Sequence, residues 1–482
     1  MEILGLVGIV LGLLLFLVLV YKGNSPFWCA ALSAAVIAAF NLMAPADAIG
    51  AFTSGAAGLV ATMLPICLGG AILGRLFSAV GATTAMAQFL TKKLVIKRAG
   101  DAQVRMAVLV CLIIAGLCTM GGIDAYILTF TLLPMIAVIA ELVDIPRRFI
   151  PALVCLTSFF MAAPGAPQID NIMARAGIMS FVYGDGAQAL APAAGEHFYV
   201  SAWAAPIPGL IAVIIMVVGG YFTLTHMILK AKRNGEHFEY GAMERLVADA
   251  DRPLPPFGIA ILPLVTVFFL YTVLPNVSPI QETPILIALA GGIAVTLITM
   301  GKYLPSKDKN GVAISKGKSA IKAINIGSDS SPYAFLQLVT PAAIAGVVTA
   351  TAAFGLVISA LAGLNISYIV LTVIAVAIIV AITSSPPAAL MVAMPVVLGI
   401  MLGHGMSPDA IIDAIPGIAR VGALAATTLE TLPFNGFILL TLSLAKTTHK
   451  ESYPSLCVLS VIWTLIGTIV AAVLIFAFPG LS

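Results

Sequence analysis

Long apolar stretches separated by short polar connections run through the whole chain. A membrane-spanning helix needs about 20 predominantly apolar residues, so a chain of 482 residues with short loops has room for about fourteen such segments. The stretch 52–90 is too long for one simple span. The predicted segments are 2–20, 27–44, 52–90, 106–123, 124–143, 150–180, 201–229, 257–275, 283–301, 333–361, 367–383, 387–403, 410–445 and 455–479.

The composition supports this pattern. Apolar residues make up 61% of the chain and charged residues only 9%, whereas a soluble domain carries about 25% charged residues. The mean hydropathy is +1.10. These values exclude a cytosolic enzyme, a secreted disulfide scaffold, a nucleic-acid-binding protein and a disordered protein. The six cysteines lie in apolar stretches without a CxxC pair, so we expect neither a metal site nor a disulfide.

Lysine and arginine are concentrated in alternate connections, which predicts the orientation. Of the 24 basic residues, 21 lie at Lys22, within 92–105, at Arg147 and Arg148, within 230–252, within 302–322, and at Lys446 and Lys450. The other connections contain acids and no base: Asp47, Asp185, Glu196, Glu282, Asp409 and Asp413. By the positive-inside rule the basic side is cytoplasmic. We therefore predict a multi-pass protein of the bacterial inner membrane with both termini on the outer side.

The segments divide into two sets of seven, which predicts an internal repeat. The sets occupy 1–229 and 257–482, and the polar stretch 230–256 forms a cytoplasmic linker. The first set starts outside and the second starts inside, so matching elements run in opposite directions. Residues that match in type are Thr119 and Thr383, Pro134 and Pro395, Pro164 and Pro433, and the runs 74–79 and 355–360. We expect an all-α polytopic membrane protein with two inverted-topology repeats, an arrangement typical of transporters.

Each half contains an apolar pair of segments with a polar centre. The ranges 106–143 and 367–403 each begin and end on one side, and their centres are 119–124 and 383–387. Each range forms either two full spans or a re-entrant hairpin. We favour hairpins, because a Ser-Ser-Pro-Pro tip fits a turn buried in protein better than one facing lipid.

The next segment in each half is interrupted by proline and glycine. The interruptions are Ala-Pro-Gly-Ala-Pro-Gln-Ile-Asp-Asn at 163–171 and Thr-Thr-Leu-Glu-Thr-Leu-Pro-Phe-Asn-Gly at 427–436. Proline removes a backbone donor, so both helices should unwind there. The N-terminus of each half-helix would then direct N–H groups at a carboxylate. The alternative is a pair of ordinary proline kinks.

Three motifs resemble the gluconate permease family, and most closely its D-3-hydroxybutyrate permease branch. They are Gly122–Tyr126 followed by Leu133-Pro134, the interruption at 163–171, and Leu432–Gly436. The family belongs to the ion transporter superfamily. The resemblance implies a cation-coupled symporter of small organic anions, with two hairpins and two unwound helices around the substrate. It also implies a homodimer.

Two departures from the family narrow this expectation. Gluconate permeases typically have a histidine among the prolines of the first interruption, and 163–167 has none, which favours a smaller and less hydroxylated acid. The Ser-Asn-Thr tips of sodium-coupled dicarboxylate carriers are also absent, and only Thr119 and the run 383–385 occupy comparable places. Sodium and dicarboxylate specificity therefore cannot be transferred to this chain.

Three acids fall within apolar segments and are candidates for ion coupling. Asp124 lies at the first predicted tip, Glu430 is the rival, and Asp170 follows. Ionisable groups at membrane depth are costly and are functional candidates by default. A carboxylate in a dry site can exchange a proton near neutral pH, although Asp124 could instead cap the following half-helix. None of the five histidines lies in mid-span, so a histidine relay is not expected.

Three bases also remain at depth, namely Arg75, Arg175 and Arg420. Each could bind a substrate carboxylate through two hydrogen bonds, or could pair with a membrane acid or extend to the interface. The predicted substrate-binding residues are Thr119, Gly121, Gly122, Pro164, Gly165, Gln168, Asn171, Thr383, Ser384, Ser385, Thr427, Thr428 and Asn435. Thr157 and Ser158 are further hydroxyl candidates, although such hydroxyls commonly bond their own helix.

We therefore expect a symporter that imports a short hydroxy acid or monocarboxylate, such as 3-hydroxybutyrate or a gluconate-like acid, by alternating access. Protons are the favoured coupling ion, with Na⁺ as the alternative, and no other cofactor is expected. The expected partners are the substrate anion and the lipid bilayer, without nucleic acid. The alternatives are a citrate or dicarboxylate symporter coupled to sodium or protons, and an anion channel. An intramembrane aspartyl enzyme lacks any catalytic signature here, so no enzymatic activity is expected.

Overall fold

The computed structural model shows an all-α polytopic membrane protein. It describes residues 2–22, 24–123, 125–195, 198–241, 243, 253–274, 283–307, 313–364, 366–383, 385–433 and 435–481. Among these residues, β pairing is limited to one bridge between Lys307 and Ala313. Seven helices in the described ranges are long and apolar enough to cross a membrane, or up to nine if each of two bent pairs is one span.

The helices follow the same order in both halves. Each half has a two-helix hairpin, a long helix, a bend with a short helix, a helix pair with a tight turn, a broken helix and a long final helix. The first half contains α1 (Glu2–Tyr21), α2 (Pro26–Phe40), α3 (Pro45–Ala79), α4 (Ala82–Leu90), α5 (Asp101–Met120), α6 (Ala125–Val143), α7 (Ile150–Val154), α8 (Ser158–Met161), α9 (Ile169–Val182), α10 (Ala187–Ala194) and α11 (Pro206–Arg233). The second half contains α12 (Phe257–Val273), α13 (Thr283–Met300), α14 (Lys316–Thr349), α15 (Ala352–Ala362), α16 (Tyr368–Thr383), α17 (Pro386–Gly403), α18 (Pro408–Glu430), α19 (Gly436–Ala445), α20 (His449–Cys457) and α21 (Thr464–Ala477).

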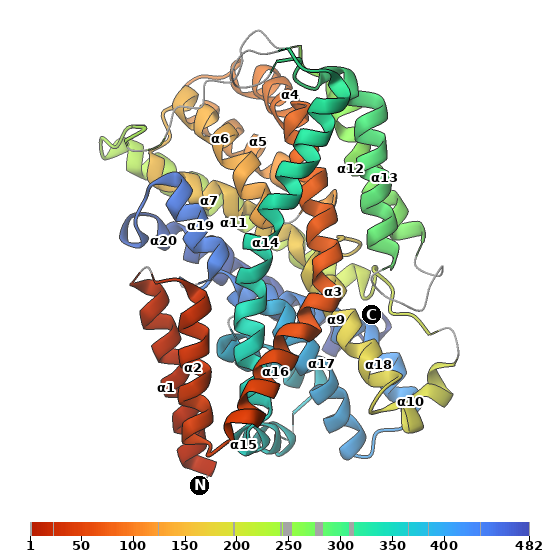
Figure 1. Ribbon diagram of the computed structural model, residues 1–482. Helices are drawn as coiled ribbons and strands as arrows, with labels where there is room; N and C mark the ends of the chain where they lie inside the picture. The colour runs from red at the N-terminus through yellow and green to blue at the C-terminus, as the bar shows by residue number, and fades with distance from the viewer. Residues whose placement is uncertain are drawn as a thin grey trace.

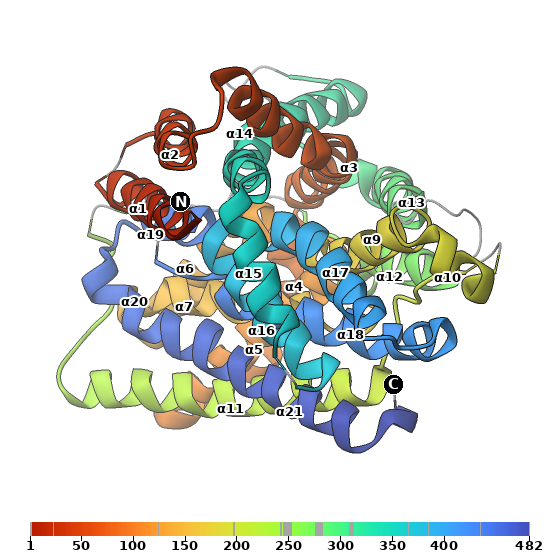
Figure 2. The same cartoon turned by 90° about the horizontal axis from the view of Figure 1, so that it is seen from below.

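The two longest helices, α3 and α14, cross in opposite directions (Figure 1) and lie together along one side of the molecule (Figure 2). Gly55 of α3 lies against Gly346 of α14, and further along α3, Ala71 and Ile72 lie against Gly327. A Cβ atom at Gly55 would be 2.8 Å from the Gly346 Cα, so the two backbones are in contact. Small residues permit this close approach between membrane helices. Matching long helices of the two halves therefore run antiparallel.

Both long helices end in a sharp bend. The chain turns by 59° between α3 and α4 and by 84° between α14 and α15. Gly81 has a φ of +77° at the first bend, a conformation that glycine adopts without strain. At the second bend, the Thr351 hydroxyl accepts a hydrogen bond from the Phe354 N–H and caps α15. The bend explains why the stretch 52–90 is too long for one span.

The tight turns of the predicted hairpins lie where the sequence places them. α5 ends at Met120 and α6 begins at Ala125, while α16 ends at Thr383 and α17 begins at Pro386. The first tip, 121–123, is buried in protein. The helices of these pairs are 16 to 20 residues long. At 1.5 Å per residue the longest could cross the bilayer completely, so the depth of the tips in the membrane stays a prediction.

The two predicted interruptions are also real breaks in the helices. The backbone is not helical over 162–168, between α8 and α9, or at 431–433 and 435, between α18 and α19. α9 then packs on α17, where a Cβ at Gly177 would lie 2.8 Å from the Leu390 carbonyl oxygen. Each break therefore lies close to elements of the other half.

Ion pairs join three of the predicted cytoplasmic connections. The Arg148 guanidinium lies 2.6 Å from the Glu236 carboxylate, and Arg233 lies 2.8 Å from Asp101. In Figure 1 the basic connections around α4, α6 and α20 lie along the top and left, whereas α10 and the start of α18 lie at the lower right. The basic connections around α4, α6 and α20 thus lie apart from the acidic connections at α10 and the start of α18 (Figure 1).

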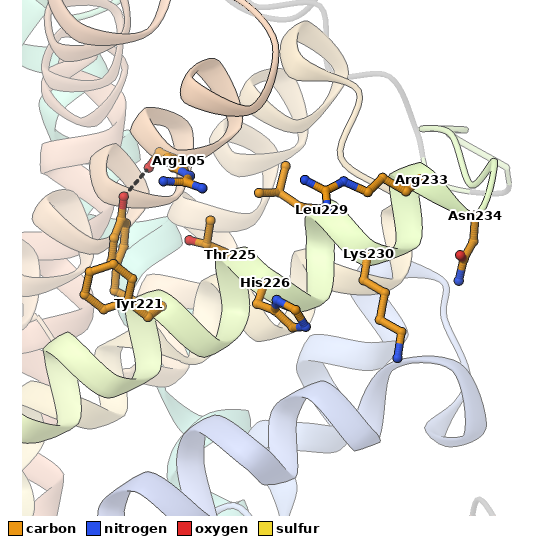
Figure 3. Close-up of a pocket in the computed structure, with 9 residues that line it drawn as sticks. Arg105, Tyr221, Thr225, His226, Leu229, Lys230, Arg233 and Asn234 are labelled. Carbon is orange, nitrogen blue, oxygen red and sulfur yellow. Dashed lines mark hydrogen bonds between the residues drawn. The ribbon is translucent and has the colours of Figure 1, made fainter.

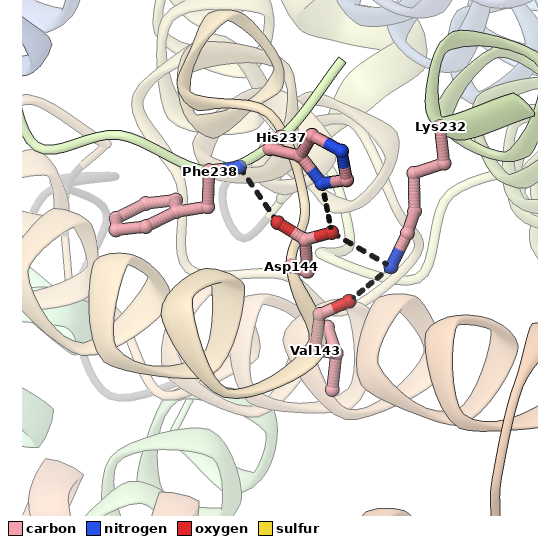
Figure 4. A network of polar contacts seen from close by, with 5 residues as sticks. All are labelled: Val143, Asp144, Lys232, His237 and Phe238. Atoms are coloured by element: carbon pink, nitrogen blue, oxygen red, sulfur yellow. Dashed lines mark hydrogen bonds and ion pairs between the residues drawn. The ribbon is translucent and has the colours of Figure 1, made fainter. Parts of the chain in front are cut away.

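Asp144 forms the centre of a further polar network on the basic side (Figure 4). Its carboxylate accepts the Phe238 N–H at 2.8 Å, lies 2.8 Å from His237 Nδ1 and 3.7 Å from Lys232 Nζ. Burial acts to raise the pKa of Asp144, but the hydrogen bonds from Phe238 and His237 and the charge of Lys232 outweigh it and lower the pKa. Asp144 thereby ties the end of α6 to the segment that follows α11.

Three sequence interpretations need correction. α14 begins at Lys316, not near 333, because Ser315 caps it and its polar first half packs on α3 at Gly327. The runs 74–79 and 355–360 lie on different sides of the two bends, so they are not equivalent positions. α11 continues to Arg233, four residues into the predicted linker, whose later part lies mostly outside the described residues.

Candidate functional site

The two breaks meet through a buried carboxylate and a hydroxyl. Asp170 lies in the first turn of α9 with 1% of its surface exposed. The Thr427 hydroxyl, in the last turn of α18, lies 2.9 Å from both Asp170 Oδ2 and the Ala423 carbonyl oxygen. Thr427 and Thr428 were predicted to be unwound, but they are helical and bond their own helix backbone. The contact joins the two halves between the first turn of α9, which follows the first break, and the last turn of α18, which precedes the second.

Asn171 stabilises the unwound backbone of the first break. Its side-chain amide donates to the carbonyl oxygens of Ala163 at 2.9 Å and Ala166 at 3.1 Å. Buried carbonyl groups outside a helix need such partners, because leaving one unsatisfied costs about 1–3 kcal/mol. Asn171 was predicted to bind substrate, and in this conformation its amide is bound to the break itself.

Arg420 of α18 is buried against the same break. Its Nη1 donates to the Ala162 carbonyl oxygen at 2.6 Å and to Asn171 Oδ1 at 2.9 Å. Its Nε and Nη2 donate to the carbonyl oxygens of Ala204 at 3.0 Å and Ala202 at 3.2 Å. All three guanidinium nitrogens therefore bind the first half of the chain. Only 2% of Arg420 is exposed, so the side chain is enclosed by protein.

Arg175 lies two turns into α9 and is also buried. Its Nε donates to the Asn171 carbonyl oxygen at 2.9 Å, and its Nη1 donates to the Tyr199 hydroxyl at 3.0 Å. Its Nη2 donates to the hydroxyl of Tyr271 on α12. The guanidinium thus links α9 to the second half, in contact with two phenols.

Gln168 connects the first break to the first hairpin tip. Its amide nitrogen donates to the Thr119 carbonyl oxygen at 2.6 Å and to the Ile123 carbonyl oxygen at 3.4 Å. The tip glycines are closely packed by α12, since a Cβ at Gly121 would lie 2.5 Å from Leu264 and one at Gly122 2.8 Å from Val267. Gly122 also has a φ of +77°. The tip, the first break and α12 therefore form one packed unit.

A second polar cluster surrounds the last residue of α18. Glu430 is 6% exposed and interacts electrostatically with the Cys155 thiol of the first half. The Tyr453 hydroxyl donates to the Thr431 carbonyl oxygen at 3.2 Å. Three further hydroxyls near these elements are buried and have no hydrogen-bond partner within the described ranges, namely those of Ser158, Thr431 and Ser452.

Two of the predicted binding residues cap helices. The Ser385 hydroxyl accepts the Ala388 N–H at the start of α17, and Asn435 Oδ1 accepts the Phe437 N–H at 2.8 Å at the start of α19. The first two residues of α17 are Pro386 and Pro387, which have no N–H group. The N-terminal end of α17, at the second tip, therefore offers few backbone N–H groups to an anion. A helix N-terminus would otherwise be expected to direct such groups at a substrate carboxylate.

Of the remaining predicted residues, Pro164 and Gly165 lie within the first break, Arg75 lies apart from it, and the side chains of the others fall outside the described residues. Gly165 has a φ of +74° and packs on Trp203, and Pro164 packs beside Gly209. Arg75 is exposed on α3. Asp124, Ser384 and the side chain of Thr383 lie outside the described residues.

Sequence reasoning missed several partners of the buried charges. Tyr199 and Tyr271 bind Arg175, Tyr453 binds the second break, and Thr468 lies 3.1 Å from Thr428. Each is an isolated polar residue in an apolar or connecting stretch, so nothing in the local pattern signals its partner.

The fold and this site define a polytopic membrane protein with two broken helices that meet at buried charges. No family model matches the chain. It is similar to an uncharacterized transporter, YxjC, of Bacillus subtilis strain 168, at 23% identity over 98% of each chain. Among solved structures it is similar to the YdaH transporter of Alcanivorax borkumensis, at a TM-score of 0.50 and 16% identity over 90% of this chain and 89% of that one. A weaker likeness, at a TM-score of 0.47 and 15% identity over 89% of this chain and 82% of that one, is to MtrF of Neisseria gonorrhoeae, described as illuminating a class of antimetabolite efflux pumps.

Proposed function

We propose that this chain is a secondary transporter that imports a small organic anion by alternating access. The observation that carries the proposal is the meeting of two broken helices from opposite halves at the buried Asp170–Thr427 contact. Broken helices in inverted repeats typically form transport sites near the membrane midplane. The whole-length similarity to a protein named as a transporter supports the same function.

The substrate class that we propose is a short hydroxy acid or monocarboxylate. It rests on the motifs that resemble the gluconate permease family and on the missing histidine in 163–167. The buried hydroxyls of Ser158, Thr431 and Ser452 support it, because they supply donors and acceptors suited to a hydroxyl-bearing substrate. A citrate or dicarboxylate substrate is the alternative that the experiment below must separate.

We propose proton coupling through Asp170 and Glu430, together with Asp124 at the first tip. Asp170 and Glu430 are both buried and lie on the two sides of the junction between the breaks. In alternating access the site opens first to one side of the membrane and then to the other. A carboxylate that binds a proton on one side and releases it on the other links proton movement to substrate movement. Sodium is the alternative coupling ion.

The experiment is uptake of labelled 3-hydroxybutyrate into proteoliposomes with an imposed pH gradient, measured together with proton flux. We expect accumulation against a gradient by the wild type. Asp170→Asn, Glu430→Gln and Asp124→Asn are compared with Asp413→Asn, which changes an exposed acid on the same helix as Glu430. At least one of the first three variants should lose accumulation and retain exchange, while Asp413→Asn should behave as the wild type.

Other outcomes would change the proposal. Competition by citrate or succinate but not by monocarboxylates would favour a dicarboxylate carrier. Accumulation driven by a sodium gradient alone would show that sodium, and not the proton, is the coupling ion. Substrate flux without proton or sodium flux would indicate a channel.

We also propose an inner-membrane location, outward-facing termini and a homodimer. Labelling of single cysteines at positions 47 and 307 in intact cells, with a reagent that does not cross membranes, tests the orientation. The outer position should react and the cytoplasmic position should not. Light scattering of the purified protein tests the dimer.

A further inference from the structure

A basic pocket lies between the start of α5 and the end of α11, on the side of the basic connections (Figure 3). The cavity has a volume of about 580 Å³ and is partly open. Arg105, Lys230 and Arg233 lie around it, and Tyr221, Phe222 and Thr225 contribute to its wall. The pocket is separate from the junction of the two breaks and has no role in the proposed transport cycle.

The charge of the pocket favours an anion. Its lining in the described part of the chain contains three bases and no acid. Arg233 is paired with Asp101 at 2.8 Å, which leaves the positive charges of Arg105 and Lys230. Arg105 and Lys230 are both exposed. Guanidinium and ammonium groups arranged in this way bind phosphate oxygens well.

An exposed apolar stripe on α11 leads into the pocket. Its members are spaced by three or four residues on one face of the helix, and each is 43–63% exposed: Ile207, Leu210, Ile214, Val218 and Phe222. The next residues on this face are His226 and Lys230, which line the pocket. From Ile207 to Phe222 the stripe is about 22 Å long, more than the depth of one leaflet of about 15 Å. α11 lies at the edge of the molecule beside α21 (Figure 2), so the stripe is accessible to lipid.

Thr225, in the pocket wall, has an unusual hydroxyl. It is 4% exposed and has no hydrogen-bond partner within the described residues. Helical threonines elsewhere in this protein, such as Thr296 and Thr441, donate to the carbonyl four residues earlier at 2.7 Å. Because Thr225 lines the cavity, a ligand oxygen bound there could satisfy this hydroxyl.

We propose that this pocket binds the phosphate-bearing headgroup of an anionic phospholipid whose acyl chain lies along the stripe on α11. The basic residues bind the phosphate, the Thr225 hydroxyl adds a hydrogen bond, and Phe222 marks the change from headgroup to acyl chain. Basic pockets between membrane helices on the cytoplasmic side are suited to such headgroups. A free phosphate ion would use the same polar groups but would leave the apolar stripe unused.

The test uses the purified full-length protein, delipidated in a neutral detergent. Phosphatidylglycerol, phosphatidylcholine and inorganic phosphate are added at matched phosphate concentrations, and thermal unfolding and bound lipid by native mass spectrometry are measured. The pocket variant is Arg105→Gln with Lys230→Gln. The control is Lys92→Gln with Lys97→Gln, which removes the same charge from exposed positions on the same side outside the pocket.

We expect phosphatidylglycerol to raise the unfolding temperature of the wild type and of the control pair. The pocket variant should bind phosphatidylglycerol at least tenfold more weakly. Equal protection by phosphatidylcholine, equal protection by inorganic phosphate, or an equal loss in the control pair would each overturn the proposal. Because transport is not measured, a failure of the transport proposal leaves this test unaffected.

Discussion

At the residue scale, the buried charges of this protein are held mainly by neutral groups. Arg420 donates to three carbonyl oxygens and an amide oxygen, and Arg175 donates to two carbonyl oxygens and two phenols. A buried charge is tolerated only when its hydrogen-bonding capacity is satisfied. The arginines thus stabilise the unwound first break, and the acids are the residues left for coupling in our proposal.

Replacing Arg420 with lysine should destabilise the protein strongly. A lysine keeps the charge but presents one nitrogen in place of the planar fork, so it cannot reach Ala162, Ala202 and Ala204 together. Hydrogen bonds to charged groups contribute about 1.5–3 kcal/mol each, so the loss should be on the order of 3 kcal/mol. Thermal unfolding in detergent measures it. Arg75→Lys on the exposed face of α3 serves as the control and should leave the unfolding temperature unchanged.

Replacing Thr427 with valine tests the junction between the two breaks. The side chain keeps its shape but loses the hydroxyl 2.9 Å from Asp170. We expect a loss of about 1 kcal/mol in the free energy of unfolding. We also expect the rate of substrate uptake to fall by more than this loss of stability alone would cause. In Thr299→Val, the removed hydroxyl binds only its own helix at Val295, so transport should persist. Equal transport by both variants would contradict a role for the junction.

At the element scale, hydropathy and helix-breaking residues specified most of the helices. The helix ends between α5 and α6 and between α16 and α17, and both breaks, lie where glycine, proline and serine interrupt apolar runs. Pro134 and Pro395 even occupy the same position, ten residues into α6 and α17. The start of α14 was missed because its first half is polar and is stabilised by packing on α3, which is a tertiary effect.

The crossing of α3 and α14 should be sensitive to a single methyl group. A Cβ at Gly55 would lie 2.5 Å from the Ala342 carbonyl oxygen, and backbone atoms cannot move aside as a flexible side chain can. We expect Gly55→Ala to cost about 1–3 kcal/mol, as other overpacking substitutions do. Gly50→Ala, on the same helix with nothing within 4 Å of the added methyl, is the matched control. A similar unfolding temperature for both variants would contradict the close contact.

At the scale of the whole molecule, charge segregation predicted the two sides and the inverted halves. It did not predict which charged residues would pair. Asp144 and Arg148 contact the segment after α11, at His237 and Glu236, and Arg233 at the end of α11 pairs with Asp101. These contacts join residues about 90 to 130 positions apart. Likewise, the pairing of Asp170 with Thr427 and of Arg175 with Tyr271 depends on how the helices pack. A single sequence does not show which distant helices are in contact.

The Asp144 network should make stability depend on acid pH. Because the folded pKa of Asp144 is lowered, its contribution is present above the pKa of a free aspartate and is lost as the pH falls through the lower folded value. Asp144→Asn removes this contribution to stability. It should not strain the backbone, since Asn also adopts the positive φ of +58° that Asp144 has here. The variant should be less stable than the wild type at pH 7, and the difference should shrink at low pH. Unfolding curves across the pH range measure it, and a constant difference would contradict the pKa argument.

The contact between α3 and α14 has a mechanical consequence. Sliding one helix along the other would replace Gly55 or Gly346 with residues that bear side chains, so translation along the pair is blocked. Rotation about this contact would separate Ala71 and Ile72 from Gly327, so the second contact opposes tilting. The two contacts together hold α3 and α14 in one fixed arrangement, and a displacement of the breaks would move other helices relative to this pair.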